Sequence, residues 1–182
     1  MVSWKLVLPV VVFVGLLGFV TGVLASSNPS RAPSSAGTIV KLGPPESLPG
    51  VANTPWCSTF QHFCVVKTGA NAYEALYTYE TNPYARSQGC EIRWQATQTY
   101  IDTETQETKT GAFRAGCNGS TYDMAGHRVF GPAARDMDRF ALKILVDPAT
   151  QLRHIEIDTH QLICAASFGS ADIPCEKAPL PQ

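Results

Sequence analysis

Cysteine and histidine are the residue types in this sequence with the widest choice of chemistry. The chain has six cysteines, at Cys57, Cys64, Cys90, Cys117, Cys164 and Cys175, and four histidines, at His62, His127, His154 and His160. An even number of cysteines in an exported domain is typical of disulfides. A zinc site is disfavoured, because the sequence has no C-x-x-C pair and no histidine at zinc-ligand spacing from a cysteine pair. Spacing alone leaves the disulfide pairing open.

No other pattern in the sequence indicates catalysis. There is no Ser/His/Asp arrangement, no phosphate-binding loop and no C-x-x-C-H haem attachment motif. The spacing of His154 and His160 suits neither one helical face nor a standard metal pair, and His127 is expected in an exposed turn. Asn118-Gly119-Ser120 fits the glycosylation acceptor pattern, but so short a motif often arises by chance. None of these residues is assigned a role.

An apolar segment precedes all the cysteines. Residues 6–24 are an uninterrupted run of apolar and small residues, long enough to cross a bilayer as one helix. The alternative is a cleaved secretory signal, with a cleavage site at 23–25. We favour the anchor, because the apolar part of a signal is usually shorter. Lys5 ahead of the run places the N-terminus in the cytoplasm, which predicts a single-pass protein of the cytoplasmic (inner) membrane with its domain on the extracytoplasmic, periplasmic side.

Composition predicts one β domain after this anchor. Residues 26–37 are rich in Ser, Pro and Ala and are expected to form a flexible linker between the anchor at 1–25 and a domain at 38–182. With charged residues at 16% and a formal net charge of −1, the chain has no basic field for nucleic acid. Short alternating segments separated by turns predict an all-β fold, with strands at 38–42, 62–67, 73–79, 90–94, 97–102, 108–113, 121–124, 128–130, 140–146 and 153–158.

Two of these segments resemble a known family. The residues concerned lie in 75–94 and 113–134, and they are Gly89-Cys90, Cys117, Gly119-Ser120, Tyr122-Asp123, Gly126 and Gly131-Pro132-Ala133. Their spacing is similar to that of the two cluster-binding boxes of Rieske iron–sulfur proteins, C-T-H-L-G-C and C-P-C-H-G-S-x-Y-D followed by G-P-A. The anchor and its small-residue linker also resemble the Rieske subunit of cytochrome bc complexes. The resemblance covers residues 38 to about 146 and implies a Rieske-type fold of small antiparallel sheets.

The four cluster ligands of the family are missing. At the positions of its two Cys and two His ligands this chain has Ala85, Ser87, Ala115 and Asn118, none of which can ligate iron in that cluster. The resemblance therefore implies no cluster, and we expect no cofactor and no metal.

The resemblance also reduces the possible disulfide pairings. Cys90 and Cys117 match the pair that forms a disulfide between the two loops in respiratory members, which would stabilise the fold by about 3 kcal/mol. Local spacing among the remaining cysteines then favours Cys57 with Cys64 and Cys164 with Cys175. We expect the two loops to face each other across the Cys90–Cys117 bridge.

The resemblance carries two further expectations about the loops. The gap that the cluster leaves should be filled by Tyr84, Arg86 and Asn118. Ser120 and Tyr122 match residues whose hydroxyls bond to the cluster sulfurs, so here these hydroxyls need other partners.

These residues predict a cluster-free Rieske-like accessory subunit of a respiratory or photosynthetic electron-transfer complex. Its partners would be other subunits of that membrane complex, and it would have no catalytic activity alone. Three alternatives remain: an electron carrier with unusual 2Fe–2S ligands, a thiol–disulfide redox protein using Cys90 and Cys117, and a freestanding membrane-anchored binding module.

Overall fold

The computed structural model describes residues 37–51, 53–58 and 60–168, which all belong to the compact unit Ser35–Gln182. The predicted anchor, all but the last residue of the predicted linker, and Cys175 lie outside the described residues. Among the described residues, no helix is both long and apolar enough to span a membrane.

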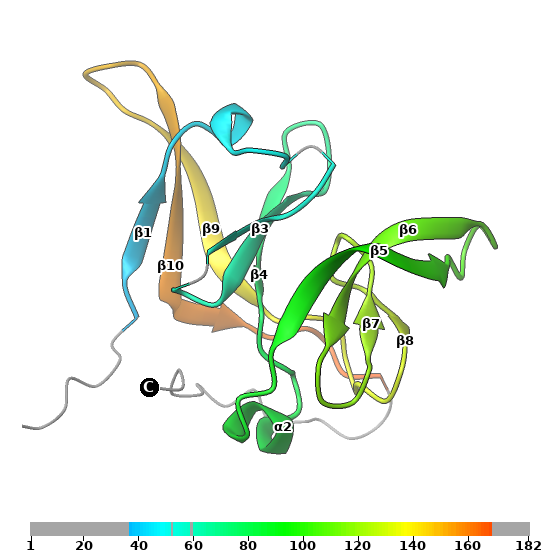
Figure 1. Cartoon of the computed structure of the whole chain (residues 1–182). Helices are drawn as coiled ribbons and strands as arrows, with labels where there is room; N and C mark the ends of the chain where they lie inside the picture. The colour runs from blue at the N-terminus through cyan, green and yellow to red at the C-terminus, as the bar shows by residue number, and fades with distance from the viewer. Residues whose placement is uncertain (1–36, 52, 59, 169–182) are drawn as a thin grey trace, which may run out of the picture. The chain divides into compact units, whose positions relative to one another are not determined.

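The described chain folds into two antiparallel sheets, as the predicted all-β class requires (Figure 1). The first sheet has the strand order β1-β10-β9-β4-β3-β2, with bounds Ile39–Leu42, Arg153–Ile163, Arg139–Val146, Tyr73–Tyr77, Phe63–Lys67 and Trp56–Ser58. The second has the order β5-β6-β7-β8, with bounds Ile92–Ile101, Thr108–Ala115, Thr121–Tyr122 and Arg128–Phe130. Two short helices accompany them, the 3₁₀ helix η2 at Pro45–Ser47 and α2 at Pro83–Ser87.

The second sheet is an insertion into the first. The chain leaves the first sheet after β4, passes through α2, forms β5 to β8 and returns as β9 (Figure 1). Strands β4 and β9 are themselves neighbours, with Ala75 opposite Phe140 and Leu76 opposite Arg139. The inserted segment therefore starts and ends at adjacent points of the first sheet.

Alternation along the strands gives the molecule two hydrophobic cores. One face of the first sheet buries a cluster that includes Phe63, Val65, Tyr77, Ile155 and Ile157. The alternate residues of β3 and β4 point to the opposite face, as the two-residue period of a strand requires. There Cys64, Val66 and Leu76 pack with residues of the second sheet, among them Ile92, Phe113 and Tyr122. The second core therefore holds the two sheets together.

Most of the predicted strands are present, although several of their bounds differ. The two strands predicted at 90–94 and 97–102 are one strand, β5, at Ile92–Ile101, with a register irregularity between Gln95 and Thr99. Strands β4 and β7 each end two residues before the predicted end. Strand β10 runs five residues beyond the predicted end at 158. Strand β2 and helix α2 were not predicted. The helix begins at a proline that follows Asn82, and this pair is a common helix start.

Candidate functional site

The first of the two loops that the sequence resemblance singled out contains helix α2. The side chain of Asn82 caps the helix by accepting hydrogen bonds from the backbone N–H groups of Tyr84 and Ala85, at 2.9 and 3.3 Å. The turn that ends the helix brings the N–H of Cys90 to the carbonyl of Ala85, at 3.0 Å. Ala85 is half-buried and Ser87 is exposed. Two of the four positions that correspond to cluster ligands therefore lie on this short helix.

The second loop is a tight turn after β6. The N–H of Gly119 donates to the carbonyl of Ala115 at 3.1 Å, and Gly119 has the left-handed φ of +73° that favours glycine. The Oδ1 atom of Asn118 accepts the N–H of Ser120 at 2.9 Å, an arrangement typical of turns that begin with asparagine. Ala115 is buried at the end of β6, whereas Asn118 is exposed. These two residues occupy the other two ligand-equivalent positions.

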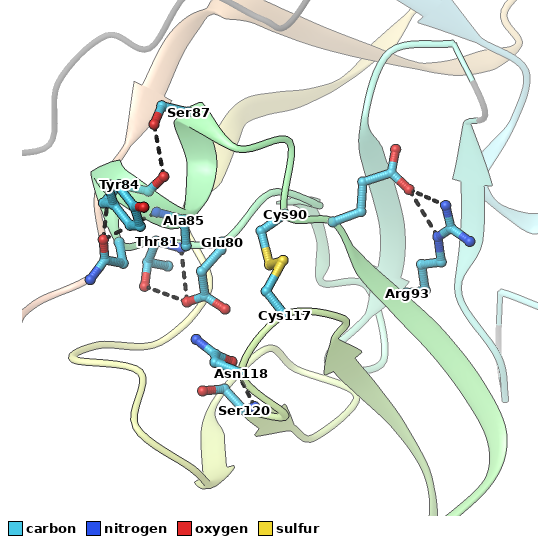
Figure 2. Close-up of a disulfide and its surroundings, with 12 residues drawn as sticks. Glu80, Thr81, Tyr84, Ala85, Ser87, Cys90, Arg93, Cys117, Asn118 and Ser120 are labelled. Carbon is cyan, nitrogen blue, oxygen red and sulfur yellow. Dashed lines mark hydrogen bonds and ion pairs between the residues drawn. A yellow bond between two sulfur atoms is a disulfide. The ribbon is translucent and has the colours of Figure 1, made fainter.

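A disulfide between Cys90 and Cys117 joins the two loops, as predicted. Figure 2 shows the bridge with Ala85 and Ser87 on one side and Asn118 and Ser120 on the other. The expectation that both loops meet across this bridge is therefore confirmed.

The hydroxyl groups of Ser120 and Tyr122 have partners within the protein. The buried Ser120 Oγ accepts the N–H of Ala133 at 2.9 Å. Gly131 passes so close that a Cβ on it would lie 2.5 Å from Ser120 Cα, which requires glycine there. The Tyr122 hydroxyl donates to Glu80 Oε1 at 3.2 Å. Burial, reinforced by the Glu80 carboxylate, raises the pKa of Tyr122, so this hydroxyl stays a donor.

The sequence analysis did not identify Glu80, which lies beside the disulfide, between the two loops (Figure 2). Its side chain is fully buried. Besides Tyr122, the N–H and hydroxyl of Thr81 donate to Oε1, at 3.1 and 3.3 Å. The other carboxylate oxygen, Oε2, has no hydrogen-bond partner in the part of the chain that the structure describes. A buried acid thus occupies the space between the loops.

A buried ion network ties the first loop to the segment before β9. Asp138 Oδ2 accepts Nη2 of Arg86 at 2.9 Å and Nη2 of Arg135 at 3.0 Å. The Nε atom of Arg86 also donates to the carbonyl of Glu80 at 3.1 Å. All three side chains of the network are at most 4% exposed. Arg86 is therefore buried, as a residue filling the gap would have to be, but its partners are Asp138 and the Glu80 carbonyl.

The expected roles of Tyr84 and Asn118 in filling the gap are wrong. Tyr84 is 74% exposed, and Asn118 is exposed as well. Tyr84 points outward because α2 turns its other face, with Arg86, toward the core. The residue that lies between the loops is Glu80.

The remaining predicted residues lie outside these loops. Cys57 and Cys64 form the predicted disulfide, and Cys164 is disulfide-bonded, while its predicted partner Cys175 lies outside the described residues. Each histidine lies beside an acid, in the pairs His62–Glu91, His127–Asp123, His154–Glu156 and His160–Asp158. In the described ranges, no three His, Cys, Asp or Glu side chains are grouped so that they could hold a metal ion.

Comparison with known proteins gives no family for this chain. No family model matches it, and no curated protein matches it significantly.

Proposed function

We propose that the chain is a Rieske-type domain that has lost its cluster and serves as a structural accessory subunit of a membrane electron-transfer complex. The observation that carries the proposal is the Cys90–Cys117 bridge between two loops whose four ligand-equivalent positions are Ala85, Ser87, Ala115 and Asn118. A 2Fe–2S cluster of this class needs thiolate and imidazole ligands. The residues at these positions do not fit one.

Two features of the loops support this proposal. The hydroxyls of Ser120 and Tyr122, which the resemblance assigns to cluster sulfur, bond instead to Ala133 and Glu80. The buried Glu80 side chain also occupies space between the two loops, beside the position where a cluster would sit. The loops thus keep a defined conformation through internal bonds and a disulfide.

The role in a complex rests on the same framework. A domain that keeps its bridge and its loop geometry can present a rigid surface to other subunits without transferring electrons. The predicted anchor at residues 6–24 would hold that surface at the membrane. The respiratory or photosynthetic character of the complex comes from the Rieske resemblance alone.

Copurification from native membranes tests the proposal. The full chain, tagged at its C-terminus, is extracted in mild detergent, isolated, and analysed for associated proteins and for iron. We expect redox-complex subunits in stoichiometric amounts and no iron that copurifies with the isolated chain. A chain that elutes alone would favour the freestanding module, and a Rieske-type paramagnetic signal from the isolated chain would favour a carrier with unusual ligands.

A further inference from the structure

The second disulfide, Cys57–Cys64, lies in a different setting from the bridge between the loops. The two cysteines are directly opposite each other on β2 and β3. Strand β2 has three residues and stands at the end of the sheet order, so within the described chain it pairs with β3 alone. A short edge strand opens at a lower free energy than the centre of a sheet.

The two sulfur-bearing residues differ sharply in burial. Cys57 is exposed, whereas Cys64 is 2% exposed and packs in the core between the two sheets. Both line a cavity of about 480 Å³, together with Ser58, His62, Glu91 and Arg93. That volume is within the range of small-molecule sites. The bond is therefore approachable from one end, at Cys57.

The imidazole ring of His62 lines the same cavity. His62 has a φ of +51°, a conformation uncommon for residues other than glycine, and such strain is often found at functional sites. Its Nε2 lies 3.4 Å from the Tyr79 hydroxyl, and its Nδ1 lies 3.8 Å from Glu91 Oε1. Glu91 is bonded in turn to the exposed Arg93, at 2.6 Å. The charged and titratable groups around the ring are thus Tyr79, Glu91 and Arg93.

We propose that Cys57–Cys64 is a thiol–disulfide exchange site whose substrate is an external dithiol. A thiolate of the dithiol attacks Sγ of Cys57, a new S–S bond forms there, and the bond to Cys64 breaks. The electron pair leaves on Cys64 Sγ, which takes a proton from the His62 ring, and the ring then takes a proton from water. The second thiolate of the dithiol then displaces Cys57, which takes a proton from water. The dithiol ends as a disulfide, and the chain has gained two electrons and two protons.

This activity is separate from the proposed role of the Rieske-like loops. It breaks the disulfide at the edge of the first sheet and leaves Cys90–Cys117 intact, although Glu91 of the cavity lining directly follows Cys90 in the chain. Exposed disulfides are more often labile or catalytic than buried ones, and rates of exchange depend on which sulfur can be reached. The bridge between the loops serves as an internal reference.

Site-resolved thiol labelling tests the assignment. The full chain in detergent is exposed to dithiothreitol for graded times and alkylated, and each cysteine peptide is quantified by mass spectrometry. Cys117 is exposed like Cys57, and Cys90 is buried like Cys64, so simple exposure predicts similar rates for the two bridges. We expect Cys57 and Cys64 to be labelled together, at least about tenfold faster than Cys90 and Cys117, because Cys57 lies on a short edge strand and lines the cavity. Equal rates, or faster labelling of Cys90 and Cys117, would overturn the proposal. The same experiment is repeated with a reduced protein that carries a C-x-x-C pair in place of dithiothreitol. If dithiothreitol reduces Cys57–Cys64 and this protein does not, the substrate is a small dithiol.

Two variants test whether the cavity and His62, and not the exposure of Cys57 alone, determine the rate of reduction. Ser58→Trp should obstruct the cavity and slow reduction of Cys57–Cys64 several-fold, whereas Thr97→Trp, on the exposed part of β5 outside the cavity lining, should leave it unchanged. In His62→Gln the reduction should be several-fold slower than in the unaltered chain, because the glutamine side chain cannot deliver a proton to Cys64 as an imidazole can. An unchanged rate in His62→Gln would remove His62 from the mechanism, and unchanged rates in both Ser58→Trp and His62→Gln would refute the site.

Discussion

Tyr122 on β7 donates its phenolic hydrogen to Glu80, 42 positions earlier in the chain, at a distance of 3.2 Å. Both side chains are fully buried. This bond links the second sheet to the segment that follows β4. Substitution of Tyr122 or Glu80 therefore tests whether this bond stabilises the structure around the loops.

Tyr122→Phe should destabilise the protein by about 1–3 kcal/mol, because it removes a donor from a buried carboxylate. The measurement is urea unfolding at neutral pH, followed by fluorescence. Tyr84→Phe is the matched control, since the Tyr84 side chain is 74% exposed and should tolerate the change. Equal stability of the two variants would mean that Glu80 obtains its hydrogen bonds elsewhere.

Asp138→Asn should be among the most damaging single changes, at about 3–5 kcal/mol, because it leaves two buried guanidinium groups without their shared carboxylate. Thermal unfolding of the full chain in detergent measures the loss. Glu107→Gln, which breaks an exposed pair with Lys109, provides the comparison and should change little. A small effect at Asp138 would show that the network adds no more than a surface ion pair.

Stability should fall at alkaline pH through Tyr77. Burial raises the pKa of Tyr77 to about 12 from its ordinary value of 10.0. The unfolded chain therefore releases this proton before the folded protein does. The stabilisation is complete below about pH 10 and is lost as the pH rises toward 12, by at most about 2–3 kcal/mol.

Tyr77→Phe isolates that contribution. Its hydroxyl is buried without a hydrogen-bond partner in the described part of the protein, so the change should alter stability little at neutral pH. Urea unfolding at several alkaline pH values should show a shallower decline in the variant. A decline identical to that of the unaltered chain would assign it to other groups, such as Tyr122.

Restoring the four ligands tests whether the loops still hold cluster geometry. The variant Ala85→Cys, Ser87→His, Ala115→Cys and Asn118→His is incubated anaerobically with iron and sulfide. We expect 2Fe–2S absorption and resonance from the quadruple variant, and none from variants with a single ligand, because the cluster needs its full set. A folded quadruple variant with its disulfides intact but no cluster would show that α2 and Glu80 have replaced the site geometry.

Local sequence patterns predicted most of the strands, but not the shortest elements. β3 and β4 are short, largely apolar runs of five residues each on either side of a turn, F-C-V-V-K and Y-E-A-L-Y, and such runs are typical of strands buried on both faces. Trp56–Ser58 is too short for any period, and its pairing depends on Cys64 and Val65 across the turn. Helix α2 carried a readable signal, since Asn82 followed by proline is a typical helix start.

Buried charges could not be predicted from the sequence. Glu80 drew no prediction, and Arg86 was expected between the loops only through the resemblance, because their buried partners, Tyr122 and Asp138, lie 42 and 52 positions away. No local period encodes such a contact. The disulfide between the loops was predictable only through the resemblance, since the spacing of six cysteines permits many pairings.

Because β4 and β9 are neighbours, the second sheet is an insertion between two adjacent strands of the first sheet. Because Leu76 and Arg139 are opposite each other, a short turn could join the two strands directly and close the first sheet without the residues between them. The first sheet would then keep its own hydrophobic core, which contains none of the inserted strands. Evolution could thus change the inserted residues between β4 and β9, including those of both loops, while the first sheet continued to fold.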